Sequence, residues 1–245
     1  MRLLSYNIHK GIGGVDRKYD LERIIAVIAA ENPDFICLQE VDKQARRSKL
    51  HDQGAMLAER FGLAAHMQQI NVHLKRGSYG NLLLSRWPLH SKHQVSLRLQ
   101  RKKPRGAQLA VIESPLGLFH LVNWHLGLAE RERHWQVAHL LEHRLFAEGA
   151  RHPTLIVGDF NDWRNTLARG PFRQHGFHQI TTPIFRFRSF PAFAALGPLD
   201  KAFQRGLLIQ KAHIVRTPAA KRASDHLPLV IDFEVAPSPP ADSPA

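Results

Sequence analysis

The chain has 245 residues, of which 44% are hydrophobic and 22% are charged. This composition is typical of a folded globular protein and excludes a disordered chain, a collagen-like repeat and a coiled coil. Lysine and arginine number 34 against 21 for aspartate and glutamate, which gives a formal net charge of +13. Such a charge attracts polyanions, so we expect a polyanionic partner, nucleic acid or the acidic headgroups of phospholipids.

Cysteine content and the amino terminus bear on the compartment. A single cysteine, Cys37, excludes an intrachain disulfide and any cysteine-clustered metal site, which favours a reducing compartment. No run approaches the roughly 20 apolar residues that span a bilayer, and residues 1–7 turn polar too early for a secretory signal. We therefore predict a cytoplasmic monomer without a transmembrane segment.

The first part of the chain alternates between strand and helix signals. Residues 2–6 form a short apolar run that ends at Asn7 and is followed by a glycine-rich turn at 11–14. The apolar residues Leu21, Ile24, Ile25 and Ile28 then follow the spacing of one helical face, which predicts a helix. Asp20 can cap its start, and the helix is expected to stop near Asn32-Pro33.

The run at 35–38 is continuously apolar, which is typical of a strand buried on both faces. It ends at Gln39 and Glu40, so a carboxylate lies at the carboxyl end of a buried strand. Cys37 lies within the same run, and we interpret it as structural.

The middle of the chain has a more antiparallel character. Residues 81–85, 107–112 and 118–125 read as strands, the last two joined by a turn at 114–117. A long helix is expected over 129–148, with one face formed by Trp135, Ala138, Leu141 and Leu145.

The last part adds three strands, at 154–158, 207–215 and 227–235. The first runs directly into Asp159, and the other two flank Ser224-Asp225-His226. Residues 236–245 are rich in proline, serine and alanine and are expected to be disordered. No linker interrupts residues 1–235, so we predict one domain there.

The chain is expected to hold about nine or ten strands, the eight above among them, but few helices. That is too many strands for one open sheet of simple βαβ order, so two packed sheets with helices outside fit better. The expected fold class is α/β (α+β).

Polar side chains recur where apolar strands end. Because strand ends in a packed sheet converge in space, these side chains could line one cleft. Carboxylates are the ligands that Mg²⁺ or Mn²⁺ prefers, asparagines can orient water or a phosphoryl oxygen, and histidines exchange protons near neutral pH. The set comprises Asn7, Glu40, His125, Asp159, Asn161, Asp225 and His226.

Each of these features also has an ordinary interpretation. Glu40 could face solvent, residues 158–162 could form an Asx-turn, Asp225 and His226 could be a surface pair, and His125 could be a core histidine. The joint pattern is harder to explain by chance, because all the placements would have to coincide.

Four segments carry a family resemblance. They are Tyr6-Asn7, Leu38-Gln39-Glu40, Gly158-Asp159-Phe160-Asn161 and Ser224-Asp225-His226-Leu227-Pro228, with weaker matches at 80–86, 123–128 and 198–203. In this order they resemble the signature motifs of the endonuclease/exonuclease/phosphatase superfamily, and the likeness runs from Arg2 to about Phe233. The resemblance is to a small bacterial single-domain member, and it implies a deoxyribonuclease-I-like four-layer sandwich of two mixed β-sheets flanked by helices.

The resemblance also implies roles for the metal-binding residues. Glu40 would be the principal ligand of Mg²⁺ or Mn²⁺, and Asn7 and Asp225 would complete or tune the site. His226 would contact the scissile phosphate or activate water, with Asp200 orienting its ring.

The remaining implied roles concern proton transfer. Asp159, with Asn161 beside it, would position the attacking water and accept its proton. His125 would stabilise or protonate the leaving group. Protons shared among these side chains and His226 would titrate together, so no single group is named as the base.

A glycine-rich turn and two basic segments are further candidates for ligand binding. The turn at 11–14 lacks the third glycine of a dinucleotide loop, because Asp16 occupies that place, and no phosphate-loop lysine follows. The basic segments 101–105 and 185–188 could bind a polyanion or simply be solvated. Our candidate substrate-binding residues are Arg86, Arg105, Arg186 and Arg188.

The resemblance and the charge together favour a divalent-metal-dependent phosphodiesterase, first of all a nuclease. The segment 195–199 lacks the tryptophan that abasic-site enzymes usually carry before the aspartate at 200, which argues against a dedicated repair role. A phospholipid or sphingomyelinase-type phosphodiesterase, or an inositol phosphate phosphatase, is the alternative. A non-catalytic nucleic-acid-binding module is the third hypothesis, and the complete set of metal and proton-transfer positions counts against it.

Overall fold

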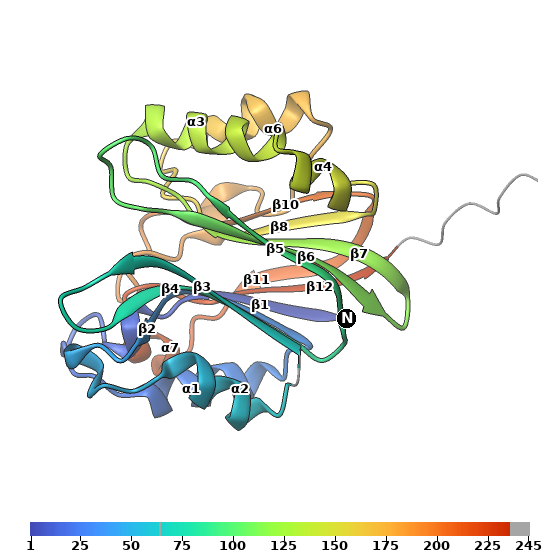
Figure 1. The fold of residues 1–245 in the computed structure, drawn as a ribbon. Helices are drawn as coiled ribbons and strands as arrows, with labels where there is room; N and C mark the ends of the chain where they lie inside the picture. Colours follow the sequence, from blue (N-terminus) through green and yellow to red (C-terminus); the bar gives the residue numbers. More distant parts are fainter. Residues whose placement is uncertain (64, 236–245) are drawn as a thin grey trace, which may run out of the picture.

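The protein forms two packed β-sheets covered by helices on their outer faces (Figure 1). This computed structural model describes residues 1–63 and 65–235, so the tail predicted for 236–245 lies outside the described residues. Each sheet has six strands. The predicted four-layer sandwich of two mixed sheets is therefore confirmed, with twelve strands in place of nine or ten.

The first sheet has the strand order β11-β12-β1-β2-β4-β3. Its only parallel pair in the described chain is β1–β2, at the centre. The strands are β1 (Arg2–Asn7), β2 (Phe35–Lys43), β3 (Ala65–His73), β4 (Ser78–Ser85), β11 (Leu207–Ile214) and β12 (Leu229–Val235).

The second sheet has the order β5-β6-β7-β8-β10-β9. Within the described residues, it too has one central parallel pair, β7–β8. The strands are β5 (Leu89–Ser96), β6 (Gly106–Ser114), β7 (Gly117–His125), β8 (Thr154–Asp159), β9 (His178–Gln179) and β10 (Asp200–Arg205).

Helices cover the two outer faces (Figure 1). The first sheet carries α1 (Leu21–Glu31), α2 (Gln53–Phe61) and α7 (Pro218–Ala223), and the second carries α3 (Glu130–Leu141), α4 (Arg144–Gly149), α5 (Thr166–Arg169) and α6 (Pro171–Gln174). Three short 3-10 helices, η1 (His9–Gly11), η2 (Arg46–Ser48) and η3 (Ile184–Phe187), lie in connections. No helix within residues 1–63 and 65–235 is long and apolar enough to cross a membrane.

Helix α1 agrees with the sequence prediction. Asp20 accepts a hydrogen bond from the backbone N–H of Glu22, and Ile24 and Ile28 are fully buried. The helix ends at Glu31, and the capping residue Asn32 adopts the left-handed conformation typical of a helix C-terminus. The apolar face of α1 therefore packs on the sheet as expected.

The single helix predicted for 129–148 is wrong, because α3 ends at Leu141 and His143 caps a separate helix α4. The predicted face is also only partly right, since Trp135 is 37% exposed. The polar residues Arg133 and Gln136 point inward instead, where they bind the backbone of the preceding loop. The hydrogen bonds of Arg133 and Gln136, and not the apolar periodicity alone, therefore determine which face of α3 is buried.

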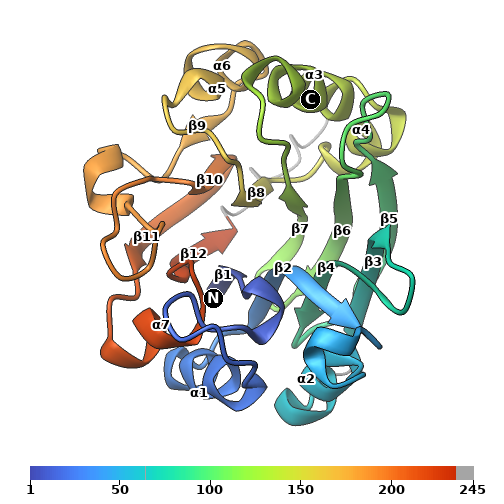
Figure 2. The same cartoon turned by 90° about the vertical axis from the view of Figure 1, so that its left-hand side faces the viewer.

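The parallel pairs position the polar strand ends. In the first sheet Asn7 lies opposite Gln39, and in the second His125 lies opposite Asp159. Asp159 is also paired with Asp200 across β8 and β10. Figure 2 looks onto the end of the sandwich where the loops that follow these strands meet.

Candidate active site

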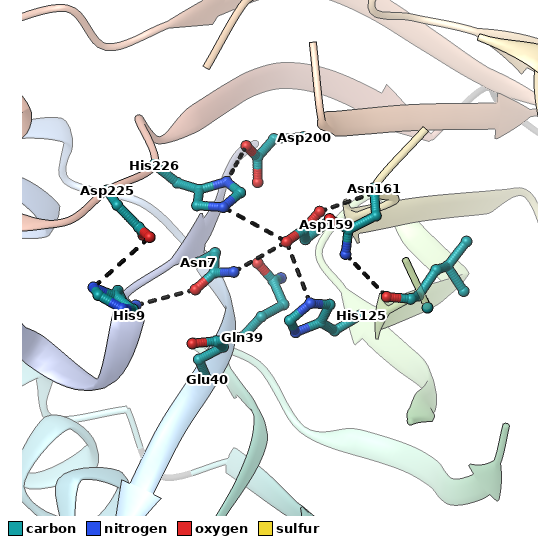
Figure 3. Close-up of polar contacts among 12 residues, drawn as sticks. Asn7, His9, Gln39, Glu40, His125, Asp159, Asn161, Asp200, Asp225 and His226 are labelled. Atoms are coloured by element: carbon teal, nitrogen blue, oxygen red, sulfur yellow. Dashed lines mark hydrogen bonds and ion pairs between the residues drawn. The ribbon is translucent and has the colours of Figure 1, made fainter. Parts of the chain in front are cut away.

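A cleft of about 340 Å³ opens between the ends of the central strands of both sheets. Seven of the residues predicted from strand ends line it: Asn7, Glu40, His125, Asp159, Asn161, Asp225 and His226. Asp200 lies behind His226 and is completely buried. The side chains converge from both sheets, as Figure 3 shows.

Glu40 reaches the cleft because β2 is irregular at this point. The register between β2 and β4 shifts between Leu38 and Val41, and Glu40 has a φ of +58°. A bulge of this kind re-aims side chains next to active sites. Gln39 consequently points between the sheets, where it donates a hydrogen bond to Asn123 at 2.8 Å, while Glu40 turns toward the cleft.

Glu40 forms an ion pair with Lys10, the residue in the middle of η1. Burial alone would raise the pKa of Glu40, but the positive charges of Lys10 and Lys103 outweigh it and hold the pKa well below its usual value. Glu40 is therefore ionised at neutral pH. Its carboxylate faces the cleft with a cation beside it.

His226, Asp200 and Asp159 form a buried chain of polar contacts (Figure 3). Nδ1 of His226 lies 2.8 Å from Oδ2 of Asp200, and Nε2 lies 3.7 Å from Oδ2 of Asp159. Asp200 also accepts a hydrogen bond from the hydroxyl of Ser189. The Asp200 carboxylate thus fixes the ring of His226 so that Nε2 is directed to the cleft.

Burial and these contacts separate the pKa values of His226, Asp159 and His125. Burial disfavours the charged imidazole, yet Asp200 and Asp159 raise the pKa of His226 to about 10. Burial raises the pKa of Asp159 to about 6. Burial and the nearby Arg105 lower the pKa of His125, so at neutral pH one histidine is protonated and the other is neutral.

The two asparagines hold Asp159 in place. Nδ2 of Asn7 donates to Oδ2 of Asp159 at 3.0 Å, and the backbone N–H of Asn161 donates to Oδ1 at 3.0 Å. Nδ2 of Asn161 donates in turn to the carbonyl of Leu126. Oδ2 of Asp159 also lies 3.3 Å from Nε2 of His125.

The three predicted metal ligands share the cleft, and each has a polar partner within the protein. Glu40 pairs with Lys10, Oδ1 of Asn7 accepts from the backbone N–H of His9, and Oδ2 of Asp225 lies 3.8 Å from Nδ1 of His9. Within residues 1–63 and 65–235, no three histidine, cysteine, aspartate or glutamate side chains are placed to hold a metal ion by themselves.

Of the four predicted substrate-binding arginines, one lies in the cleft and three lie elsewhere. Arg105 lines the cleft, is only 6% exposed, and its Nε has no hydrogen-bond partner among the described residues. Arg86 follows Ser85, which pairs with Phe35 at the start of β2, and its guanidinium binds Asp34. It therefore lies at the opposite end of the sheet from the cleft, because β4 runs antiparallel to β2.

Arg186 and Arg188 are also not brought into the cleft. Both side chains are exposed, and their backbone carbonyls accept hydrogen bonds from Arg216. Arg186 lines a separate groove beside β11. A basic run in the sequence does not indicate which way its loop faces, and this is why only Arg105 reaches the site.

Several residues of the cleft were missed by sequence reasoning: His9, Lys10, Leu128, Trp163 and Phe190. Lys103 belongs to the basic segment 101–105 that the sequence indicated. Lys10 and Trp163 follow the ends of β1 and β8 by a few residues, so their position after a buried strand was an available signal. Phe190, which packs on His226 with ring centroids 4.8 Å apart, carried no local signal.

A buried ion pair braces the loop that carries Asp159 and Asn161. Nζ of Lys201 donates to the carbonyl of Asp162 and to Oδ1 of Asn165, both at 2.7 Å, and lies 3.5 Å from the Asp162 carboxylate. Asp162 also caps α5 by accepting from the backbone N–H of Thr166. Both charged side chains are almost fully buried.

Lys201→Met should destabilise the fold, because it leaves the Asp162 carboxylate buried without its cation. We expect the free energy of unfolding to fall by about 3 kcal/mol, measured by urea denaturation. Lys211→Met, at an exposed position of β11 in the other sheet, is the matched control and should change stability little. Equal stability of both variants would contradict the bracing role.

Comparisons with known proteins bear on this geometry. The sequence profile described as "Endonuclease/Exonuclease/phosphatase family" matches residues 4–226. The chain belongs to this family. Membership confirms the resemblance found in the sequence and assigns the chain to a family of phosphate-ester hydrolases.

Individual proteins are similar to this chain over most of its length. Escherichia coli (strain K12) YbhP is 28% identical over 246 residues, which cover 96% of each chain. An endonuclease/exonuclease/phosphatase structure from Beutenbergia cavernae superposes with a TM-score of 0.78 at 22% identity, covering 98% of this chain and 73% of that one. The mannosyl-6-phosphatase Bt3783 of Bacteroides thetaiotaomicron superposes with a TM-score of 0.70 at 15% identity, covering 95% and 99%. At these identities the structures share the fold with this chain.

Proposed function

We propose that the cleft hydrolyses phosphodiester bonds with the help of a divalent metal ion, Mg²⁺ or Mn²⁺. The observation that carries the proposal is the convergence of an ionised glutamate, Glu40, with the buried pair of His226 and Asp200 and with Asp159. An anionic metal ligand, a protonated imidazole and a proton acceptor are the groups that hydrolysis of a phosphate ester needs.

The residues present fit such an ion. Glu40 provides an ionised carboxylate, and Asn7 and Asp225 provide further oxygen atoms on the same cleft. Mg²⁺ is usually held by one or two carboxylates and keeps several waters, so a three-carboxylate cluster is not required. Lys10 balances the charge of Glu40 in this structure, and this pairing supports a place for a cation beside the carboxylate. When bound, the ion would stabilise negative charge on the phosphoryl oxygens.

The other side chains supply orientation and proton transfer. His226, protonated at neutral pH, would donate from Nε2 to a phosphoryl oxygen. Asp159, whose pKa is about 6, is mostly ionised at pH 7 and would accept a proton from the attacking water. His125 and the buried Arg105 would stabilise the leaving oxygen. Because Asp159 contacts both histidines, these protons titrate as a coupled set.

The proposed substrate class is inferred from the positive charge of the cleft and of the whole chain. Arg105 and Lys103 both line the cleft, and together with the net charge of +13 they favour an anionic substrate. Nucleic acid remains the prediction from the sequence, with phospholipid and inositol phosphate as alternatives. The cytoplasmic location and monomeric state likewise remain predictions from the sequence.

The function is tested with small soluble esters. We expect hydrolysis of bis-p-nitrophenyl phosphate in the presence of Mg²⁺ or Mn²⁺ and none with excess EDTA. Greater activity on the monoester p-nitrophenyl phosphate would favour the phosphatase alternative. Absence of any metal-dependent turnover on either ester would contradict the proposal.

Lys10→Met should strengthen metal binding, because the ammonium group competes with a divalent ion for the Glu40 carboxylate. We expect the dissociation constant for Mn²⁺, measured by electron paramagnetic resonance, to fall at least about fivefold. Lys18→Met, an exposed position in the same connection, is the control. Weaker Mn²⁺ binding by the Lys10 variant would contradict this competition.

A further inference from the structure

Several large apolar side chains are exposed to solvent around the mouth of the cleft. Among the described residues, the four most exposed large apolar side chains are Leu128 (74%), Val15 (64%), Phe193 (63%) and Leu196 (61%). Trp163, 51% exposed, lies with them. We call these five residues the apolar rim. Several large apolar side chains exposed around one opening indicate an interaction site.

Contacts tie the rim to the cleft on several sides. Leu128 and Trp163 line the cleft themselves. The Trp163 ring meets Phe190 nearly at right angles at 6.0 Å, and Phe190 packs on His226. A Cβ atom on Gly197 would lie 2.6 Å from the Trp163 ring, so the loop carrying Phe193 and Leu196 is packed against this tryptophan.

The loops that carry the rim are held by hydrogen bonds while the rim side chains stay outside. The N–H of Leu196 donates to the carbonyl of Phe190 at 2.9 Å, and the N–H of Ala192 donates to the carbonyl of Asp225 at 2.7 Å. On the other side of the cleft, a Cβ on Gly14 would lie 2.7 Å from Cα of Asp225, which places Val15 next to this residue. The fold therefore presents these side chains to solvent at fixed positions.

Positive charge accompanies the apolar side chains. Arg17 and Lys18 follow Val15, and Arg164 follows Trp163, and all three side chains are exposed. Among the nearby acidic groups, Asp16 pairs with Arg23 at 2.6 Å, and Glu130 lies 3.9 Å from Arg164 and offsets part of its charge. The positive charge beside the rim therefore comes mainly from Arg17 and Lys18. Apolar side chains flanked by lysine and arginine are typical of surfaces that bind anionic membranes.

The kind of apolar residue distinguishes two anionic partners. Single-stranded nucleic acid binds by stacking its bases on aromatic rings. Three of the five rim residues, Val15, Leu128 and Leu196, are aliphatic and have no ring for a base to stack on. Aliphatic side chains instead gain free energy by entering the acyl boundary of a lipid layer.

We propose that the apolar rim docks on the surface of an anionic phospholipid bilayer, which would place the cleft at the level of the headgroup phosphates. This inference rests on the proposed function in one respect, because it names headgroup phosphodiesters as the substrate class. Docking itself depends only on the rim and on the charges beside it.

Vesicle binding tests the docking surface. The triple variant Val15→Ser, Phe193→Ser and Leu196→Ser removes three rim residues that do not line the cleft. In co-sedimentation, the unmodified protein should bind vesicles of phosphatidylcholine and phosphatidylglycerol in equal amounts and should bind phosphatidylcholine vesicles weakly. The triple variant should bind the mixed vesicles at least about tenfold more weakly.

Two controls make the result specific. The double variant Leu116→Ser and Leu208→Ser changes residues that are 48% and 53% exposed on other parts of the molecule, and it should bind vesicles as the unmodified protein does. Both sets of variants should hydrolyse bis-p-nitrophenyl phosphate at the unmodified rate, because this small ester needs no surface.

Three results would overturn the proposal. The unmodified protein could fail to bind mixed vesicles, the triple variant could bind them equally well, or the triple variant could lose affinity for a single-stranded oligonucleotide that the unmodified protein binds in place of vesicles. The failure of the proposed function would look different. Vesicles would then be bound through the rim, while neither the small ester nor the lipid phosphodiester would be hydrolysed.

Discussion

Glu40→Gln is expected to reduce Mg²⁺-dependent hydrolysis of bis-p-nitrophenyl phosphate by at least about a thousandfold. The substitution keeps the size of the side chain but removes the negative charge that a divalent ion needs at this position. The fold should persist, because the amide loses only its ion pair with Lys10 and stays at the same bulge of β2. Turnover at saturating Mg²⁺ and a thermal unfolding curve measure the two effects.

Glu113→Gln is the matched control for this experiment. Glu113 is exposed near the end of β6, remote from the cleft, so its charge should not affect turnover. If Glu40→Gln retained the activity of the control, Glu40 could not be the principal metal ligand. The proposed reaction would then lack its central group.

Asp200→Asn is expected to lower activity by about a hundredfold and to change its pH dependence. Asp200 raises the pKa of His226 through its charge and its hydrogen bond to Nδ1. In the unmodified protein the protonated imidazole should persist until the pH rises through about 10. Without this carboxylate the pKa of His226 falls, so activity should decline at a lower pH on the alkaline side.

The same substitution affects stability with a defined sign. A histidine whose pKa is raised on folding contributes stability that is fully present below its unfolded pKa of roughly 6.5 and is lost as the pH rises toward the folded value. Asp200→Asn should therefore cost more free energy of unfolding at pH 6 than at pH 10. Ser189→Ala removes another partner of Asp200 but keeps the charge, and it should leave the alkaline limb of the rate profile in place. An unchanged profile in Asp200→Asn would contradict the role of this carboxylate.

Sequence reasoning succeeded where strands are buried on both faces. The apolar runs of β1, β2 and β8 are visible without a structure because almost every side chain in them is buried. β5 was missed because it is an edge strand whose side chains alternate between partly buried and exposed, with a lysine and two histidines among them. β10 was missed as a strand, although the motif at its start identified Asp200.

Residues at strand ends could be assigned to one cleft from the sequence for a physical reason. The prediction failed for residues to which that reason does not apply. Parallel neighbours bring their carboxyl ends together, so Asn7 and His125 could be placed before the fold was known. The ion pair of Glu40 with Lys10 depends on the turn of η1 and could not be predicted from spacing. The placement of Arg86 failed because the direction of β4 relative to β2 decides which end of the sheet it occupies.

We propose that Glu40, Asn7 and Asp225 bind one divalent ion in the cleft. Anomalous diffraction from crystals grown with Mn²⁺ would locate this ion. We expect a manganese peak in the cleft, beside the Glu40 carboxylate and with Lys10 displaced from it. A peak bound elsewhere, or an intact ion pair between Glu40 and Lys10 at saturating Mn²⁺, would contradict the account.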